Sequence, residues 1–249
     1  MKKTLLFSFV VSITLLLTSY KALMYKINAD VLSVLGYSKS LADEHILGTV
    51  RAGSAWFAKP GNIPKFISMS SDEKTEIAKE FCVYIKSYVY SQEFKDKYEA
   101  YRQSKKPVVR QLSEDEKMAA RDAIAQQEEM FTPELLEMFP ESAEGALASI
   151  ADAKAELNGE MTSAQKAEWE KTAPSDPYKN IKKGLQTFLD DTKDVDYNAA
   201  TELNNYNRKI FVNPAYENKP FYWKACYRAG REVSEVGRNF AKEWLAELK

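Results

Sequence analysis

The two cysteines, Cys82 and Cys226, are the residues of this chain best suited to covalent chemistry. Each lies in an apolar stripe at helical spacing, which leaves three interpretations open. They could form a disulfide that joins distant parts of the chain, pack as two separate buried thiols, or supply a nucleophilic or redox thiol. A reactive thiolate needs an electropositive, exposed setting. Arg228 and Arg231 fall on other faces of the helix expected around Cys226, so the first two interpretations are favoured.

His45 is the single histidine, which excludes metal sites built from several histidines. The adjacent Asp43 and Glu44 point to other sides of a helix and do not converge on its ring. The sequence also contains no glycine-rich phosphate loop, G-x-S-x-G turn, H-E-x-x-H pair or calcium-binding loop. We therefore expect no metal and no cofactor, and the catalytic residues of any enzyme activity remain unknown.

Two aromatic stretches, SAWFAKPGNIPKF and NPAYENKPFYW, could line a groove for a glycan or a peptide. On that interpretation His45, Trp56 and Trp223 are the candidate pocket residues. The alternative is that these rings fill the protein core, which is the more frequent role of large aromatic side chains.

Helix start signals recur along the chain and predict a mainly helical fold. Ser38 or Ser40 can cap a helix that runs through His45 towards Val50. Capping-box patterns, with Ser or Thr followed three residues later by Glu or Gln, occur at Ser70, Ser113 and Thr162, while Ser91, Thr132-Pro133, Pro140 and Asp176-Pro177 mark further starts. The stretch ATELNNYNRKIFV, with two short runs around an asparagine-rich turn, suggests a small β-hairpin.

The last helix is expected to be long and to run from Pro220 to Leu248. Its apolar residues recur at spacings of three and four, as in a heptad seam: Trp223, Cys226, Gly230, Val233, Gly237, Phe240, Trp244 and Leu248. A glycine inside a helix costs about 1 kcal/mol relative to alanine. Gly230 and Gly237 therefore predict the close approach of another backbone or of a bulky ring.

Charge and aromatic content divide the chain into three parts. Residues 111–171 carry 15 acidic and 5 basic side chains, whereas residues 1–110 have a net charge of +7 and residues 172–249 of +2. Large rings dominate core energetics, and they are scarce in the middle part. We expect a discontinuous core domain formed by residues 30–106 and 175–249, with an acidic helical insertion at 107–174.

The N-terminus has the pattern of an export signal. Lys2 and Lys3 precede an apolar run at residues 5–17, which is short for a membrane span, while no clear cleavage site follows it. Residues 1–25 are thus either a cleaved signal peptide or a retained anchor, and in both cases the rest of the chain lies outside the cytoplasm. Membrane contact is expected only through this segment, if it is retained.

Two stretches, EFCVYIKSYVYSQEFKDKYEAYRQSKKP and NPAYENKPFYWKACYRAG with its tail FAKEWLAEL, resemble a family of exported bacterial proteins of uncharacterised function. The resemblance covers the two flanks and omits the acidic middle part. It implies a bacterial, extracytoplasmic protein, and it implies no activity, cofactor or site residue.

These observations predict a mainly α fold: a helical bundle with a long C-terminal helix, an acidic helical insertion and a small β-hairpin. A net charge of −1 disfavours nucleic-acid binding. The function expected is non-enzymatic binding or scaffolding in the periplasm or elsewhere in the cell envelope, with a protein partner for the acidic insertion. The alternative is an envelope hydrolase, acting on a glycan through carboxylates that the sequence does not single out.

Overall fold

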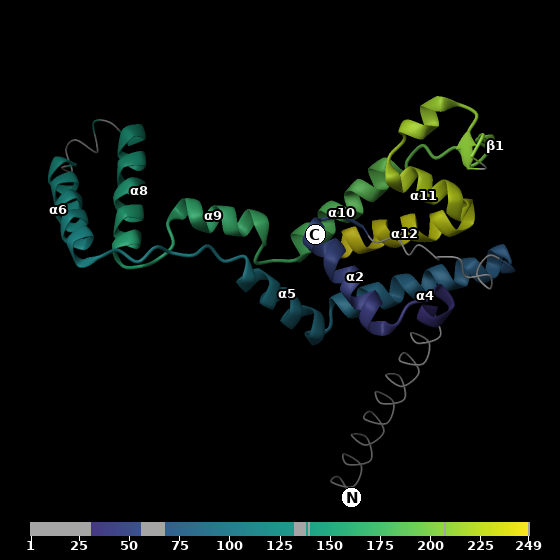
Figure 1. Cartoon of the computed structure of the whole chain (residues 1–249), viewed down its shortest axis with the longest axis horizontal. Helices are drawn as coiled ribbons and strands as arrows, with labels where there is room; N and C mark the ends of the chain where they lie inside the picture. Colours follow the sequence, from purple (N-terminus) through teal and green to yellow (C-terminus); the bar gives the residue numbers. More distant parts are fainter. Residues whose placement is uncertain (1–30, 56–67, 132–137, 139, 207, 249) are drawn as a thin grey trace, which may run out of the picture. The chain divides into compact units, whose positions relative to one another are not determined.

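A computed structural model describes residues 31–55, 68–131, 138, 140–206 and 208–248 (Figure 1). The fold is mainly helical, with one small two-stranded antiparallel sheet and a long C-terminal helix, so the predicted fold class is confirmed. The export segment at 1–25, the Thr132-Pro133 start signal and Trp56 lie outside the described residues.

The chain divides into two compact units. The first comprises Met1–Tyr98 and Pro177–Lys249, and the second comprises Glu99–Asp176. The sequence placed the start of the insertion at residue 107, eight residues after the start of the second unit. The difference arises because the helix Gln92–Ser104 continues across the boundary without a change in backbone conformation.

Helices α2 (Lys39–Ala52), α4 (Ser71–Val89) and α5 (Gln92–Ser104) begin at the predicted caps. The Ser38 hydroxyl accepts a hydrogen bond from the amide of Leu41, and Ser70 forms a complete capping box with Glu73. The amide of Phe94 donates to the Ser91 hydroxyl. These contacts satisfy amide groups that the first turn of a helix leaves without intrahelical partners.

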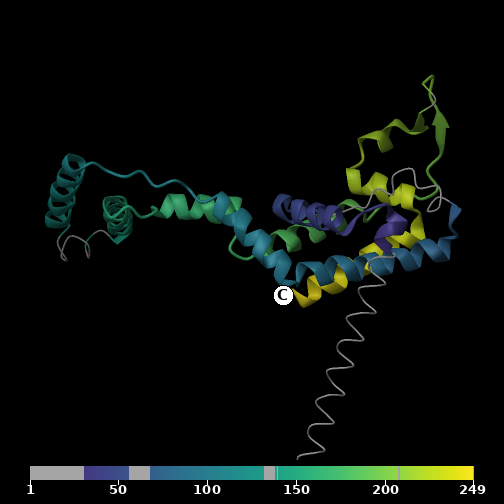
Figure 2. The same ribbon diagram turned by 60° about the horizontal axis from the view of Figure 1, so that its bottom comes forward.

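Helix α12 (Arg231–Glu247) is central to the first unit, because it packs against α4, α10 (Tyr178–Asp191) and α11 (Phe221–Ala229) (Figures 1 and 2). The C-terminal ends of α4 and α12 are joined by an ion pair of 2.6 Å between Lys86 and Glu247. The indole of Trp244 donates to the Tyr90 hydroxyl nearby, at 3.2 Å. The two helices therefore run in the same direction.

The C-terminal helix is shorter than predicted, because Gly230 breaks the expected helix into α11 and α12. Gly230 has φ 89° and ψ 163°, a conformation outside the helical region that glycine adopts readily. The predicted continuous seam from Trp223 to Leu248 is therefore wrong at this point. At Gly237 the expected close approach of a bulky ring is present, since a Cβ there would lie 3.6 Å from the Phe188 ring.

The predicted hairpin is present as β1 (Thr201–Leu203) and β2 (Lys209–Phe211), with Glu202 opposite Ile210. A 3-10 helix, η1 (Pro214–Asn218), follows. Phe211 and Ala199 pack against Trp223, which is fully buried, and the Trp223 indole donates to the carbonyl of Asp194 at 3.1 Å. The first turn of α11 therefore packs against the hairpin through an aromatic cluster.

The second unit contains α6 (Glu114–Met130), α8 (Pro140–Leu157) and α9 (Ser163–Thr172). Helices α6 and α8 pack against each other, with Ile124 and Ile150 buried. The capping boxes predicted at Ser113 and Thr162 are confirmed. The Arg102 guanidinium lies 3.8 Å from the centre of the Trp169 ring, so a cation–π contact connects the two ends of this unit.

Within the part of the chain that the structure describes, we find no helix with the length and apolar character needed to span a membrane.

Candidate functional site

The structure places the predicted pocket residues in different surroundings. His45 is exposed on α2, and its ring meets the edge of the Tyr37 ring at 5.8 Å between centroids. Trp223 is fully buried in the hairpin cluster, so the core interpretation of its ring holds. Neither residue is among those that line the pocket described below.

Cys82 and Cys226 are both free and do not lie near each other, so the disulfide interpretation is wrong. Cys226 is fully buried on α11, while Cys82 is partly buried on α4. Burial raises the pKa of the Cys82 thiol to about 12 and also raises that of Cys226. Both thiols are therefore neutral near pH 7 and behave as small apolar side chains.

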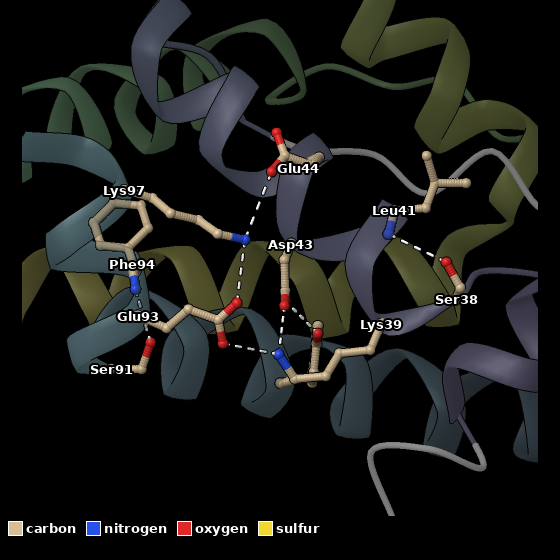
Figure 3. A network of polar contacts seen from close by, with 10 residues as sticks. Ser38, Lys39, Leu41, Asp43, Glu44, Ser91, Glu93, Phe94 and Lys97 are labelled. Carbon is tan, nitrogen blue, oxygen red and sulfur yellow. Dashed lines mark hydrogen bonds and ion pairs between the residues drawn. The ribbon is translucent and has the colours of Figure 1, made fainter. Parts of the chain in front are cut away.

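A polar network connects the start of α2 to α4 and α5 (Figure 3). Its centre is the buried carboxylate of Asp43, which accepts a hydrogen bond of 2.5 Å from the Tyr84 hydroxyl and one of 2.5 Å from the Lys39 ammonium. Burial, together with this hydrogen bond to Asp43, raises the pKa of Tyr84 well above its ordinary value. The tyrosine therefore donates to the carboxylate over the whole neutral range.

The network continues outward from Lys39 to Glu93 at 3.1 Å, and Lys97 bridges Glu93 and Glu44 at 3.1 and 3.6 Å. Burial alone would lower the pKa of Lys39, but hydrogen bonds to Asp43 and Glu93 outweigh it and raise that pKa. Hydrogen bonds from Lys39 and Lys97 lower the pKa of Glu93. Positive and negative groups alternate in this network and pair with one another. We therefore infer that the network holds α2 against α4 and α5 and is not a ligand-binding site.

An apolar pocket of about 620 Å³ lies within the first unit. Its walls come from α2, α4, α10, α11 and α12, and from the residues that follow α2. Most of the lining side chains are apolar, as in Ile46 and Val50 of α2, Ile77, Ala78 and Phe81 of α4, Leu185 of α10, Ala225 of α11, and Val233 and Phe240 of α12. The volume falls within the range typical of sites for small molecules, roughly 300–1,000 Å³.

The hydroxyl groups in the pocket wall are engaged by the backbone. Thr49 donates to the carbonyl of Ile46 at 2.8 Å, and Ser234 donates to that of Gly230 at 2.7 Å. Ser54 lies 3.4 Å from the carbonyl oxygen of Thr49. With the neutral thiol of Cys82, these groups complete a wall that offers few polar contacts to a ligand.

Charged groups reach the pocket at two positions, Lys74 in the first half of α4 and Arg228 in the last turn of α11. No carboxylate is found among the described residues that line the pocket. The pair of carboxylates that glycoside hydrolysis requires is therefore not found in this wall, and the hydrolase hypothesis gains no support from it.

Sequence reasoning identified two of the apolar faces that form the pocket, but not the pocket itself. The apolar stripe that contains Cys82 and the seam through Val233 and Phe240 were predicted as packing surfaces. Both faces line the pocket, and Gly230 interrupts the helix between α11 and α12, each of which adds lining residues. A glycine within an apolar helical pattern is the sequence signal that could have indicated the break between α11 and α12.

Comparisons with protein-family models, with curated proteins and with solved structures found no match to this chain.

Proposed function

We propose that this protein binds a small apolar or amphiphilic molecule in the pocket of its first unit, and that it acts by binding rather than by catalysis. The supporting observation is the pocket of about 620 Å³, most of whose lining side chains are apolar. Burial of an alkyl chain contributes about 0.8 kcal/mol per methylene group. A chain of ten or more carbons can therefore offset the entropy lost on association.

The export pattern at residues 1–25 supports a location for this activity outside the cytoplasm of a bacterium, in the periplasm or elsewhere in the cell envelope. Apolar molecules need a carrier or a sequestering protein in an aqueous compartment, because water excludes their hydrocarbon surface. The acidic second unit is the part of the chain that we propose for contact with a basic protein partner.

The proposal can be tested with a fatty-acid probe whose fluorescence rises in apolar surroundings, such as dansyl-labelled undecanoic acid. We expect saturable binding of one probe per chain, at probe concentrations below those that form micelles. Substitution Ala78→Trp places an indole within the pocket wall and should weaken binding at least tenfold.

Val83→Trp is the matched control, because Val83 lies on the same helix, is 47% exposed and does not line the pocket. The control should bind the probe as the unmodified protein does. Equal binding by Ala78→Trp and Val83→Trp would show that the probe occupies another surface, and absence of saturable binding to the unmodified protein would overturn the proposal.

A further inference from the structure

The charged side chains among the described residues that line the pocket are both positive. Lys74 and Arg228 line it together with apolar side chains, and they come from different helices, α4 and α11. Lys74 is partly buried and Arg228 is exposed. Long basic side chains commonly lay their methylene stems on apolar surface and hold the charged group at its edge. The pocket thus combines a hydrocarbon wall with positive charge and, among its described lining residues, no negative charge.

Resting on the proposed function, we infer that the ligand is a single-chain amphiphile with an anionic head group, whose chain fills the apolar pocket and whose head group pairs with Lys74 and Arg228. A carboxylate and a phosphate share the required chemistry, because both accept charge-assisted hydrogen bonds from ammonium and guanidinium groups. The hydroxyls of Thr49 and Ser234 are already engaged by backbone carbonyls, so they are poor partners for an uncharged head group.

The experiment compares four ligands with the same twelve-carbon chain and different head groups. Dodecanoate and dodecyl phosphate are anionic, 1-dodecanol is neutral and dodecyltrimethylammonium is cationic. Each is used to displace the fluorescent fatty-acid probe at pH 7.5, below its micelle-forming concentration. We expect at least one anionic ligand to bind about tenfold or more tightly than the alcohol, and the cation to bind more weakly than the alcohol.

The double variant Lys74→Gln with Arg228→Gln should remove this preference, so that dodecanoate and dodecyl phosphate no longer bind more tightly than dodecanol. The matched control is Lys79→Gln with Lys242→Gln, which removes the same charge from exposed positions of α4 and α12 outside the pocket. It should retain the preference for the anion.

The outcomes distinguish a failure of the head-group inference from a failure of the proposed function. If all four ligands bind with the same affinity, the head-group inference is overturned and the proposed function stands. If none of the four displaces the probe, the proposed function itself is overturned. If the Lys74 and Arg228 double variant still prefers an anion, the head group pairs elsewhere and the inference is wrong. Dodecanoate and dodecyl phosphate then distinguish a fatty acid from a phosphorylated lipid as the source of the anion.

Discussion

Gly184 on α10 packs directly against the backbone at Ser54, where the chain leaves α2. A Cβ at position 184 would lie 2.6 Å from the carbonyl carbon of Ser54 and 2.7 Å from its oxygen. This contact holds together two walls of the apolar pocket, since Ser54 and the neighbouring Leu185 both line it. Only glycine permits so short a separation between the two segments.

Gly184→Ala should therefore destabilise the protein by about 1–3 kcal/mol, because backbone rather than a flexible side chain must move to accommodate the methyl group. The free energy of unfolding from urea titration measures the effect. Gly48→Ala on α2 is the control, since a Cβ there meets nothing within 4 Å. This control should be stabilised by up to about 1 kcal/mol through helix propensity, and an equal response of both variants would contradict the close contact.

The buried Asp43 network gives a second stability prediction. Tyr84→Phe removes the hydroxyl that donates to Asp43 and leaves a buried carboxylate with one partner fewer, which should cost about 1–3 kcal/mol. Glu44→Gln removes an exposed partner of Lys97 at 3.6 Å and should change the free energy of unfolding by less than about 1 kcal/mol. If Glu44→Gln lowered the free energy of unfolding as much as Tyr84→Phe, the exposed ion pairs would contribute as much to stability as the buried hydrogen bond to Asp43, which would contradict this account.

The two glycines of the C-terminal region should respond in opposite directions. Gly230→Ala forces an L side chain into a backbone with φ 89° and should destabilise by about 1 kcal/mol or more. Gly237→Ala lies inside α12, where the new methyl group meets the Phe188 ring at an ordinary distance of 3.6 Å. Its free energy of unfolding should stay level or rise by up to about 1 kcal/mol. If Gly230→Ala proves neutral, α11 and α12 form the single helix that the sequence pattern predicted.

Stability should fall at alkaline pH, and Cys82 should contribute to the fall. Burial holds the pKa of Cys82 at about 12 in the folded protein, above the ordinary value of 9.0. The thiol of the unfolded chain therefore loses its proton first, so its contribution to stability is complete below about pH 9 and is lost between pH 9 and 12. From pH 9 to pH 10, the unmodified protein should lose about 1 kcal/mol more than Cys82→Ala. Urea titrations of both proteins at the two pH values measure this difference, and identical losses would contradict the raised pKa.

The helices were predictable from the sequence because their signals are local. Ser70, Ser113 and Thr162 each stand three residues before a Glu or Gln that completes a capping box, and all three boxes are present. The asparagine-rich turn of the hairpin is a local signal of the same kind. Such signals act within one turn of the chain and do not depend on the tertiary fold.

The pocket could not be predicted in this way, because helices from distant parts of the chain form it together. The apolar stripe of α4 has the same sequence pattern whether it packs in a closed core or lines a pocket. The same limit applies to Cys82 and Cys226, for which the sequence left a disulfide and two separate buried thiols open: both lie on apolar faces, and only the fold shows that the two thiols do not meet. Gly230 could be read as a packing glycine or as a break, and the structure shows the break.

The most direct test of the binding proposal is the dependence of affinity on chain length, measured by calorimetric titration with saturated fatty acids from eight to sixteen carbons. If the alkyl chain occupies the apolar pocket, affinity should rise about fourfold with each added methylene, as expected for about 0.8 kcal/mol of burial, and then level off when the pocket is full. Ala78→Trp should reach the plateau at a shorter chain than Val83→Trp. Affinity that does not change with chain length, or that rises equally in the two variants without levelling off, would contradict binding in this pocket.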